Sequence, residues 1–592
     1  MSYYKEELKL QTVVEALNRL TVDDLKKHLA LLPTTEKLTR KPELVAEIAQ
    51  HLGGSRLRGL WERLDETQQA AVSEVVHSPN GLFRAERFQA RTGRQPDWGT
   101  RDQWGYNPTP SLLCLFIYRD GLMPVELQER LKPFVPEPPA PELKATDEIP
   151  EFFNWRAESF DFEARRREVK VKQIPVTQVA MERHALHDLH TVLRLIERGK
   201  LSVSDKTLLP SAATVDEVAA LLRGGDYYYA PDQPKKKRYE QEVGPVKAFA
   251  WPLLVQAAGL AELSGKRLAL TKAGRKALSS PAADTLRLCW QRWLKTKLLD
   301  ELRRIEVIKG QTGKGARGLI TTALRRAVIA DALKECPVNQ WVKTDEFFRF
   351  MRAAGFDFEV TRDPWELYVE EQEYGSLGYE GFGKWSILQG RYALCLLFEY
   401  AATLGVIDVG YVPPEGARQD FSDLWGADDY EFFSRYDGLL YFRLTPLGAY
   451  CLGLTDKYVP TQVTARAKIS VLPSLKITSV WSLDRARTMA ALENGHQIAE
   501  LREFLQARDE QLLPETVEAF LQEAERNAKR LRDRGPAVLV ECADAQLAEA
   551  LAQLERTRPL CLRAGEKHLV AAADEEKFRQ MLHNLGYCLP KV

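Results

Sequence analysis

The sequence predicts a mostly helical α+β protein built from several small domains. Two observations lead to this: a short strand-to-helix motif occurs twice, and the helical pattern gives way near the C-terminus to short strands alternating with helices. At roughly 100–200 residues per domain, a chain of 592 residues has room for about three to five domains. Hydrophobic and charged fractions of 45% and 28% are typical of folded globular protein.

The repeated motif lies at residues 268–278 (LALTKAGRKAL) and 441–453 (YFRLTPLGAYCLG). In both copies a short alternating strand is followed by Thr at a helix N-cap position and by Gly three residues later. Such a strand-to-helix ending is typical of the close of a winged-helix domain. We interpret the Thr and the Gly as fold-determining residues that set the register of neighbouring basic segments.

Composition shifts predict six segments. They are a helical head at 1–55, a winged-helix-like domain at 56–134, a Pro-rich linker and basic strand at 135–175, a winged-helix domain at 176–282, an extended winged-helix domain with insertions at 283–460, and a small α+β domain at 461–592. The linker VPEPPAPELKATDEIP is the clearest boundary, because Pro-rich acidic segments remain extended. The stretch FDFEARRREVKVKQ after it alternates and is strongly basic, which predicts an exposed strand.

The net charge is zero, with 83 basic and 83 acidic residues. A nucleic-acid binder with this balance needs local basic patches, since the whole chain does not attract phosphate. None of the eight cysteines forms a CxxC pair, and most lie in apolar surroundings, which predicts reduced thiols. With no secretion signal pattern and no apolar run near 20 residues, we expect a cytoplasmic protein without membrane contact.

The helical head contains LTVDDLKKHLALL followed by LTRKPELVAEIAQHL. This pair of helices resembles a SAP motif, a small nucleic-acid-binding helical module. The resemblance implies that Lys37, Arg40 and Lys41 face phosphate. The alternative is a helical hairpin that packs on the next domain.

Three further basic segments are candidates for DNA contact. They are the PKKKR run, the Gly-rich loop VIKGQTGKGARGLIT and the helix VKTDEFFRFMRAAG, which lies near the recognition position of a winged helix. The candidate residues are Lys235, Lys236, Lys237, Arg238, Lys309, Lys314, Arg317, Lys343, Arg349 and Arg352. Basic loops neutralise phosphates, whereas the alternative for each loop is a solvated connection. The Gly-rich loop fails the P-loop template, because Gly310 and Gly313 are too close and Lys314 is followed by Gly.

No catalytic constellation is recognisable. The sequence lacks GxSxG, HExxH and a GxGxxG that follows a strand. His184, His187 and His190 are spread around a helix turn, and no Cys or carboxylate completes a tetrahedral metal set. We therefore expect no metal, no cofactor and no enzymatic activity, with a divergent nuclease as a minority alternative.

The C-terminal segment carries a second resemblance. Its parts are SVLP, LLPETVEAFLQEAERNAKRL, AVLVECADAQLAEAL and LHNLGYCL, between residues 470 and 589. Together they resemble the helicase-associated region of XPB-type helicases, especially stand-alone bacterial relatives. The resemblance implies DNA engagement and damage recognition. The ATPase chemistry of that family cannot be carried over, since this sequence contains no P-loop and no DEAD-like or DEAH-like box.

These observations favour a non-catalytic DNA-binding accessory or adaptor protein. Its expected partners are duplex or forked DNA and a separate helicase or nuclease, in DNA repair or phage defence. The alternative is a protein–protein scaffold whose winged helices bind partner subunits, which the zero net charge and the acidic linker favour.

Overall fold

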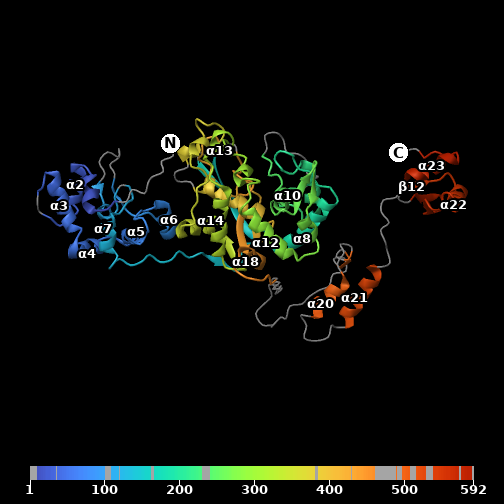
Figure 1. Cartoon of the computed structure of the whole chain (residues 1–592), viewed down its shortest axis with the longest axis horizontal. Coiled ribbons are helices and arrows are strands. Elements are labelled where there is room, and N and C mark those ends of the chain that lie inside the picture. The colour runs from blue at the N-terminus through green and yellow to red at the C-terminus, as the bar shows by residue number, and fades with distance from the viewer. Residues whose placement is uncertain are drawn as a thin grey trace. The chain divides into compact units, whose positions relative to one another are not determined.

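The structure is a computed structural model. It describes residues 10–34, 37–100, 109–118, 120–161, 166–229, 241–380, 385–427, 430–459, 488–489, 492, 497–506, 515–528, 538–571 and 575–589. The chain divides into two compact units, Met1–Gln462 and Val463–Val592. Helices predominate and the sheets are small, so the predicted α+β class is confirmed (Figure 1).

The first part of the larger unit is a helical bundle with its own core. Its elements are α1 (Val13–Asn18), α2 (Val22–Leu29), α3 (Lys41–His51), α4 (Gly54–Glu62), α5 (Glu66–Val76), α6 (Ala85–Thr92), β1 (Gly99–Thr100), β2 (Thr109–Pro110), η1 (Leu112–Leu115) and α7 (Val125–Leu131). Leu17, Leu44, Val72, Phe116 and Leu127 are buried in one hydrophobic cluster. The segments predicted as a helical head and as the following domain therefore share a core.

The middle of the larger unit begins with strands. They are β3 (Ala145–Thr146), β4 (Phe152–Asp161), β5 (Arg166–Pro175) and β6 (Thr177–Val179). The next elements are α8 (Met181–Glu197), α9 (Ala212–Leu221), α10 (Lys247–Ala257), β7 (Ala261–Ser264), β8 (Arg267–Leu270), α11 (Lys272–Ala277) and α12 (Ala282–Trp293). Between α8 and α9, Ser202 forms an antiparallel bridge with Arg267 of β8. The order is thus helix, short bridging segment, two helices and a hairpin.

The same order recurs later in the chain. The elements are η2 (Glu301–Arg304), α13 (Lys314–Gly318), α14 (Thr322–Lys334), β9 (Trp341–Lys343), α15 (Thr344–Ala354), η3 (Pro364–Glu366), α16 (Leu377–Glu380), η4 (Ser386–Gly390), α17 (Arg391–Cys395), η5 (Leu396–Ala401), β10 (Ile407–Tyr411), β11 (Leu439–Leu444) and α18 (Pro446–Leu452). The three segments η4, α17 and η5 follow one another directly and are called the composite helix below. Here the short strand is β9, whose Lys343 pairs with Tyr441 of β11.

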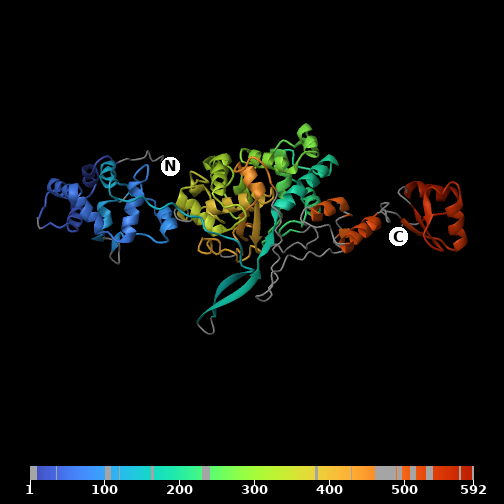
Figure 2. The same cartoon turned by 90° about the horizontal axis from the view of Figure 1, so that it is seen from below.

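The second hairpin lies in a five-stranded sheet of order β3-β9-β11-β10-β6, with antiparallel neighbours. One continuous core runs through both repeats and includes Trp251, Trp290, Tyr392 and Phe442. Among the strands that the structure describes, β4 and β5 pair only with each other. Figure 2 shows them as a long two-stranded ribbon that extends away from the helices beside it.

The smaller unit contains two separate hydrophobic clusters. One joins α20 (Ile498–Gln506) and α21 (Glu515–Ala528). The other is built from β12 (Val538–Glu541), α22 (Ala545–Gln553), β13 (Cys561–Arg563), β14 (His568–Ala571) and α23 (Glu575–Asn584). Its sheet has the antiparallel order β12-β14-β13. Ala548, Leu569 and Phe578 lie at the centre of this second core.

Candidate nucleic-acid interface

The first copy of the repeated motif caps a helix and closes a hairpin. The Thr271 hydroxyl accepts a hydrogen bond from the Gly274 amide at 3.1 Å and donates one to the Gly259 carbonyl at 2.8 Å. A Cβ atom on Gly274 would lie 2.0 Å from the Leu260 carbonyl oxygen, so only glycine fits here. The motif thereby fixes α11 against the turn that precedes β7.

The second copy makes the same contacts. The Thr445 hydroxyl accepts from the Gly448 amide at 2.8 Å and donates to the Gly405 carbonyl at 2.7 Å. A Cβ atom on Gly448 would lie 2.0 Å from the Val406 carbonyl oxygen. Gly259 and Gly405 both have positive φ, at 71° and 70°. The two stretches therefore occupy equivalent places in two units of the same order.

The helix that precedes each hairpin is buried. In α10 the side chains of Trp251 and Leu254 are fully buried, and in the composite helix those of Tyr392 and Phe398 are too. The two helices contact each other through α10 and η5. Neither helix therefore presents a free polar face that could enter a DNA groove in this arrangement.

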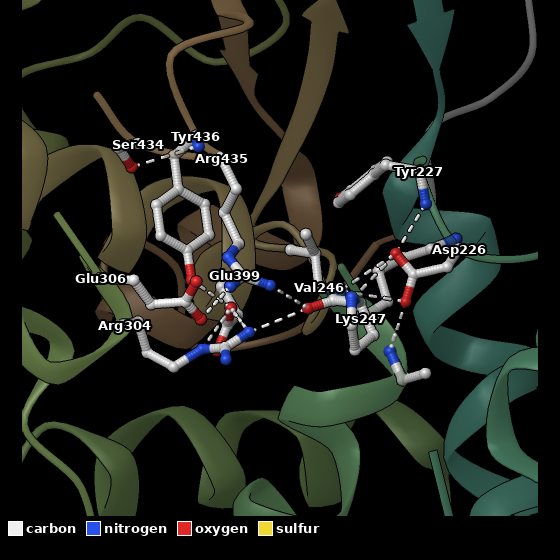
Figure 3. A network of polar contacts seen from close by, with 12 residues as sticks. Asp226, Tyr227, Val246, Lys247, Arg304, Glu306, Glu399, Ser434, Arg435 and Tyr436 are labelled. Atoms are coloured by element: carbon white, nitrogen blue, oxygen red, sulfur yellow. Dashed lines mark hydrogen bonds and ion pairs between the residues drawn. The ribbon is translucent and has the colours of Figure 1, made fainter. Parts of the chain in front are cut away.

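Buried polar groups hold these two helices in place (Figure 3). Arg304 donates to the Glu399 carboxylate at 2.9–3.1 Å and to the Pro245 carbonyl at 2.8 Å, just before α10. Burial disfavours the charge of Arg304, but the attraction and hydrogen bonds of Glu399 together with the effect of Tyr436 outweigh it, and the guanidinium pKa lies above its ordinary value. The Tyr436 hydroxyl donates to the same carboxylate. Glu399 is thus fully satisfied, as a buried charge must be.

Asp226 fixes the start of α10 from the other side. Its carboxylate accepts hydrogen bonds from the backbone amides of Val246, Lys247 and Ala248 at 2.8–3.3 Å. Amides at a helix N-terminus have no partner inside the helix, and a negative charge there is favoured by the helix dipole. The position of α10 is therefore set by sequence-distant polar groups as well as by its apolar residues.

The SAP-like residues lie at the surface of the helical bundle. Lys37 and Arg40 are exposed, and Arg40 is 3.9 Å from Glu43. Lys41 donates to the Asn18 carbonyl at 2.9 Å, so its ammonium group ties α3 to the end of α1. The four basic residues 235–238 lie outside the described residues.

The Gly-rich loop is held by its own glycines. A Cβ atom on Gly315 would lie 2.0 Å from the Gly310 carbonyl oxygen, where the short helix α13 begins. The Lys309 ammonium donates to the Glu306 carbonyl at 2.8 Å. Lys314 and Arg317 are exposed on α13. Of the three predicted residues in this loop, these two are therefore placed for contact with a ligand in solvent.

The Arg349 side chain is held by contacts within the fold. Its guanidinium binds Glu346 at 2.7 Å and donates to the carbonyl groups of Ala90 at 2.8 Å and Glu142 at 2.5 Å. The Glu346 hydrogen bonds raise the guanidinium pKa above its ordinary value. These contacts join α15 to α6 and to the Pro-rich linker.

Lys343 and Arg352 line one open cavity of about 900 Å³. The Lys343 ammonium lies 3.3 Å from Asp345, and the Arg352 guanidinium lies 5.7 Å from the centre of the Trp385 ring. Asp420 lines the same cavity, so the two cations share it with carboxylates. The structure brings these two predicted residues together, whereas Arg349 lines a different cavity of about 720 Å³.

A stronger concentration of positive charge lies on the first hairpin and was missed by sequence reasoning. We define the basic hairpin surface by its eight exposed residues: Arg194, Arg198, Lys200, Lys266, Arg267, Lys272, Arg275 and Lys276. All eight lie in two segments, 194–200 and 261–277, which together contain two acidic residues, Glu197 and Glu262. Among the described residues, none of the eight forms an ion pair. The Ser202–Arg267 bridge and the contact of α8 with β8 bring the two segments together.

The signal for this surface was present in the motif LTKAGRKAL itself. Its basic residues stand between the residues that α11 buries, so they lie on the exposed side of this short helix. Sequence reasoning used this stretch only as a fold marker. The contribution of the end of α8 depends on a bridge between distant residues, which the sequence does not reveal.

The three predicted histidines do not converge on a metal. His187 Nδ1 lies 3.1 Å from Asp188, and burial, together with the cation of Lys247, lowers the pKa of His184 to about 4. In the part of the chain that the structure describes, no three His, Cys, Asp or Glu residues are grouped as metal ligands.

Comparison of the chain with models of known protein families found no match, and comparison with curated proteins found none either. Across the described helices, none combines the length and the apolar character that crossing a membrane requires.

Proposed function

We propose that this chain is a non-catalytic DNA-binding accessory protein that acts with a separate helicase or nuclease in DNA repair or phage defence. Two features support a tandem winged-helix architecture. The order helix, extended segment, helix, helix and hairpin occurs twice, with η3 and α16 inserted before the composite helix in the second copy. In both copies the extended segment pairs with the last strand of the hairpin. Such domains contact DNA through the third helix, through the hairpin or through both.

The basic hairpin surface is the observation that carries this proposal. Because α10 is buried, DNA contact in the first repeat falls to the β7–β8 hairpin and its neighbours. Lys266 and Arg267 lie at the hairpin turn, and Lys272, Arg275 and Lys276 lie on the helix that follows. Exposed cations without an ion-pair partner favour contact with the phosphate backbone, which supplies affinity with little sequence preference.

Mobility-shift experiments with the whole chain test the proposal. We expect binding to duplex and forked DNA that weakens steeply as salt increases from about 50 to about 200 mM, because phosphate contacts release counterions. If the protein binds neither duplex nor forked nor single-stranded DNA at the lowest salt, the proposal is wrong.

A second candidate function is a protein–protein scaffold, and the smaller unit favours it. Leu539 on β12 and Leu562 on β13 are 64% and 69% exposed, and both pair in register with Val570 on the central strand β14. An exposed aliphatic row across a sheet is typical of an interaction surface. If Leu539→Ser together with Leu562→Ser abolishes capture of a helicase or nuclease subunit and leaves DNA binding unchanged, this function gains support.

A further inference from the structure

The β4–β5 ribbon is a sheet of its own among the described strands. Both strands have ten residues, so the ribbon is about 33 Å long at the usual rise per residue. They pair in register from Phe152 with Pro175 to Asp161 with Arg166, and with no other strand among the described residues. An isolated two-stranded hairpin is marginally stable in water. The length of this ribbon therefore calls for a functional explanation.

The root of the ribbon is anchored to the body of the larger unit. Trp155 packs so closely on Gly416 that a Cβ atom there would lie 1.7 Å from the indole nitrogen. The Val176 amide donates to the Glu151 carbonyl at 2.8 Å, which closes the ribbon below its first pair. The root is therefore fixed, and the strands continue beyond it in the direction shown by Figure 2.

Positive charge is concentrated on β5. This strand carries Arg166, Arg167, Lys170 and Lys172 against one acidic residue, Glu168. Positions two apart in a strand share a face, so positions 166, 168, 170 and 172 belong to one face by register. Three of these four positions are basic, and the acidic positions on that face are Glu168 and, opposite Arg166 on β4, Asp161. Lys172 is exposed, and so is Val171.

We propose that the β4–β5 ribbon is an arm that lies along the major groove of duplex DNA. The inference rests on the proposed DNA-binding function and adds a second contact, remote in sequence from the basic hairpin surface. The major groove, about 12 Å wide and about 8.5 Å deep, admits a two-stranded β-ribbon, whereas a single strand of DNA offers no such groove. The sequence of β5 supplies the positive charge that a phosphate-lined groove favours, and contact with the groove walls supports a ribbon that is marginally stable alone.

The test uses the whole chain with two ribbon variants and one control. In the shortened variant, residues 158–169 are replaced by Asn-Gly, since Ala157 and Lys170 face each other in register and a two-residue turn can join them. The point variant is Lys170→Ala with Lys172→Ala. The control is Lys295→Ala with Lys297→Ala, which removes the same charge from exposed residues elsewhere. Affinity for duplex DNA is measured across a salt series, with circular dichroism melting to check folding and dimethyl sulfate protection to report guanine N7 in the major groove.

We expect both ribbon variants to bind duplex DNA at least about tenfold more weakly than the control at low salt, and the point variant to lower the salt slope by about 2. The shortened variant should also lose guanine N7 protection.

If both ribbon variants bind DNA as tightly as the wild type does, the ribbon proposal is wrong and the proposed function still stands. A shortened variant that binds DNA normally but no longer self-associates in sedimentation would make the ribbon a contact between copies, which also overturns the proposal. If the wild type binds no DNA, the proposed function itself fails, and the ribbon proposal fails with it. Should the shortened variant not fold, the point variant decides alone.

Discussion

At the scale of single residues, the two repeats depend on their threonine and glycine residues. Thr445 is 1% exposed, caps α18 and also donates to the Gly405 carbonyl at 2.7 Å. Its hydroxyl thus satisfies a helix N-terminus and a turn carbonyl at once. These two bonds explain why the motif needs a side-chain hydroxyl and cannot use a β-branched residue without an oxygen.

Replacement of Thr445 by Val should lower the free energy of unfolding by about 1 to 2 kcal/mol, because the cap is lost and the Gly405 carbonyl loses a donor. Urea denaturation of both proteins measures the difference. Thr39→Val at an exposed position is the control and should change stability by less than about 0.5 kcal/mol. Equal effects at the two positions would contradict the proposed role of Thr445.

His184 should make stability depend on pH. Burial first, and then the nearby cations Lys247 and Arg223, lower its folded-state pKa to about 4, below the ordinary 6.5. As pH falls from 6.5 towards 4, the unfolded chain takes up this proton before the folded chain does, so the contribution of the neutral imidazole to stability is lost.

Urea denaturation at about pH 7, 6 and 5 checks this effect against His184→Gln, which does not titrate in that range. The wild type should lose more stability than the variant on acidification. Identical losses in the two proteins would show that His184 takes up its proton equally in both states.

At the scale of elements, the packing of α10 against the composite helix decides which surfaces are free. The repeated motif and its strand-to-helix geometry were predictable, because Thr and Gly at fixed spacing have a local structural cause. The burial of both helices was not, since it depends on pairs such as Arg304 with Glu399 and Asp226 with the start of α10. Sequence reasoning placed the recognition position near α15, whereas the helix that directly precedes the second hairpin is the composite helix.

Glu399→Gln tests the link between these elements. The substitution keeps the shape of the side chain but leaves the buried Arg304 charge unpaired, and breaking such a pair costs about 3 to 5 kcal/mol. The control is Glu62→Gln in the exposed pair with Arg58, where we expect less than about 1 kcal/mol. Calorimetric or denaturant unfolding compares them, and a loss at Glu399 no larger than at Glu62 would contradict the account.

At the scale of the whole molecule, zero net charge conceals an uneven distribution. The basic residues predicted from sequence divide into three groups: exposed ones such as Lys314, residues engaged in the fold such as Arg349, and those outside the described residues. The engagement of Arg349 depends on the carbonyl groups of Ala90 and Glu142, which no local pattern could reveal. The basic hairpin surface emerges only when α8 and β8 come together.

The two units should unfold independently. Their described residues belong to different hydrophobic clusters, and the division falls between Gln462 and Val463. A chain that ends at Gln462 should therefore keep the melting temperature that the larger unit shows in the full chain, within about 2 °C. Differential scanning calorimetry makes the comparison, and a large drop in melting temperature would show that the cores depend on each other.

The salt dependence of duplex DNA affinity tests the central claim most directly. We expect Lys266→Ala alone to weaken binding, and the double variant Lys266→Ala with Arg267→Ala to lower the slope of log affinity against log salt by about 2. Lys295→Ala with Lys297→Ala removes equal charge from exposed residues elsewhere and should leave the slope unchanged within about 0.5. Equal slopes for the wild type, the double hairpin variant and the control would show that DNA does not contact the basic hairpin surface.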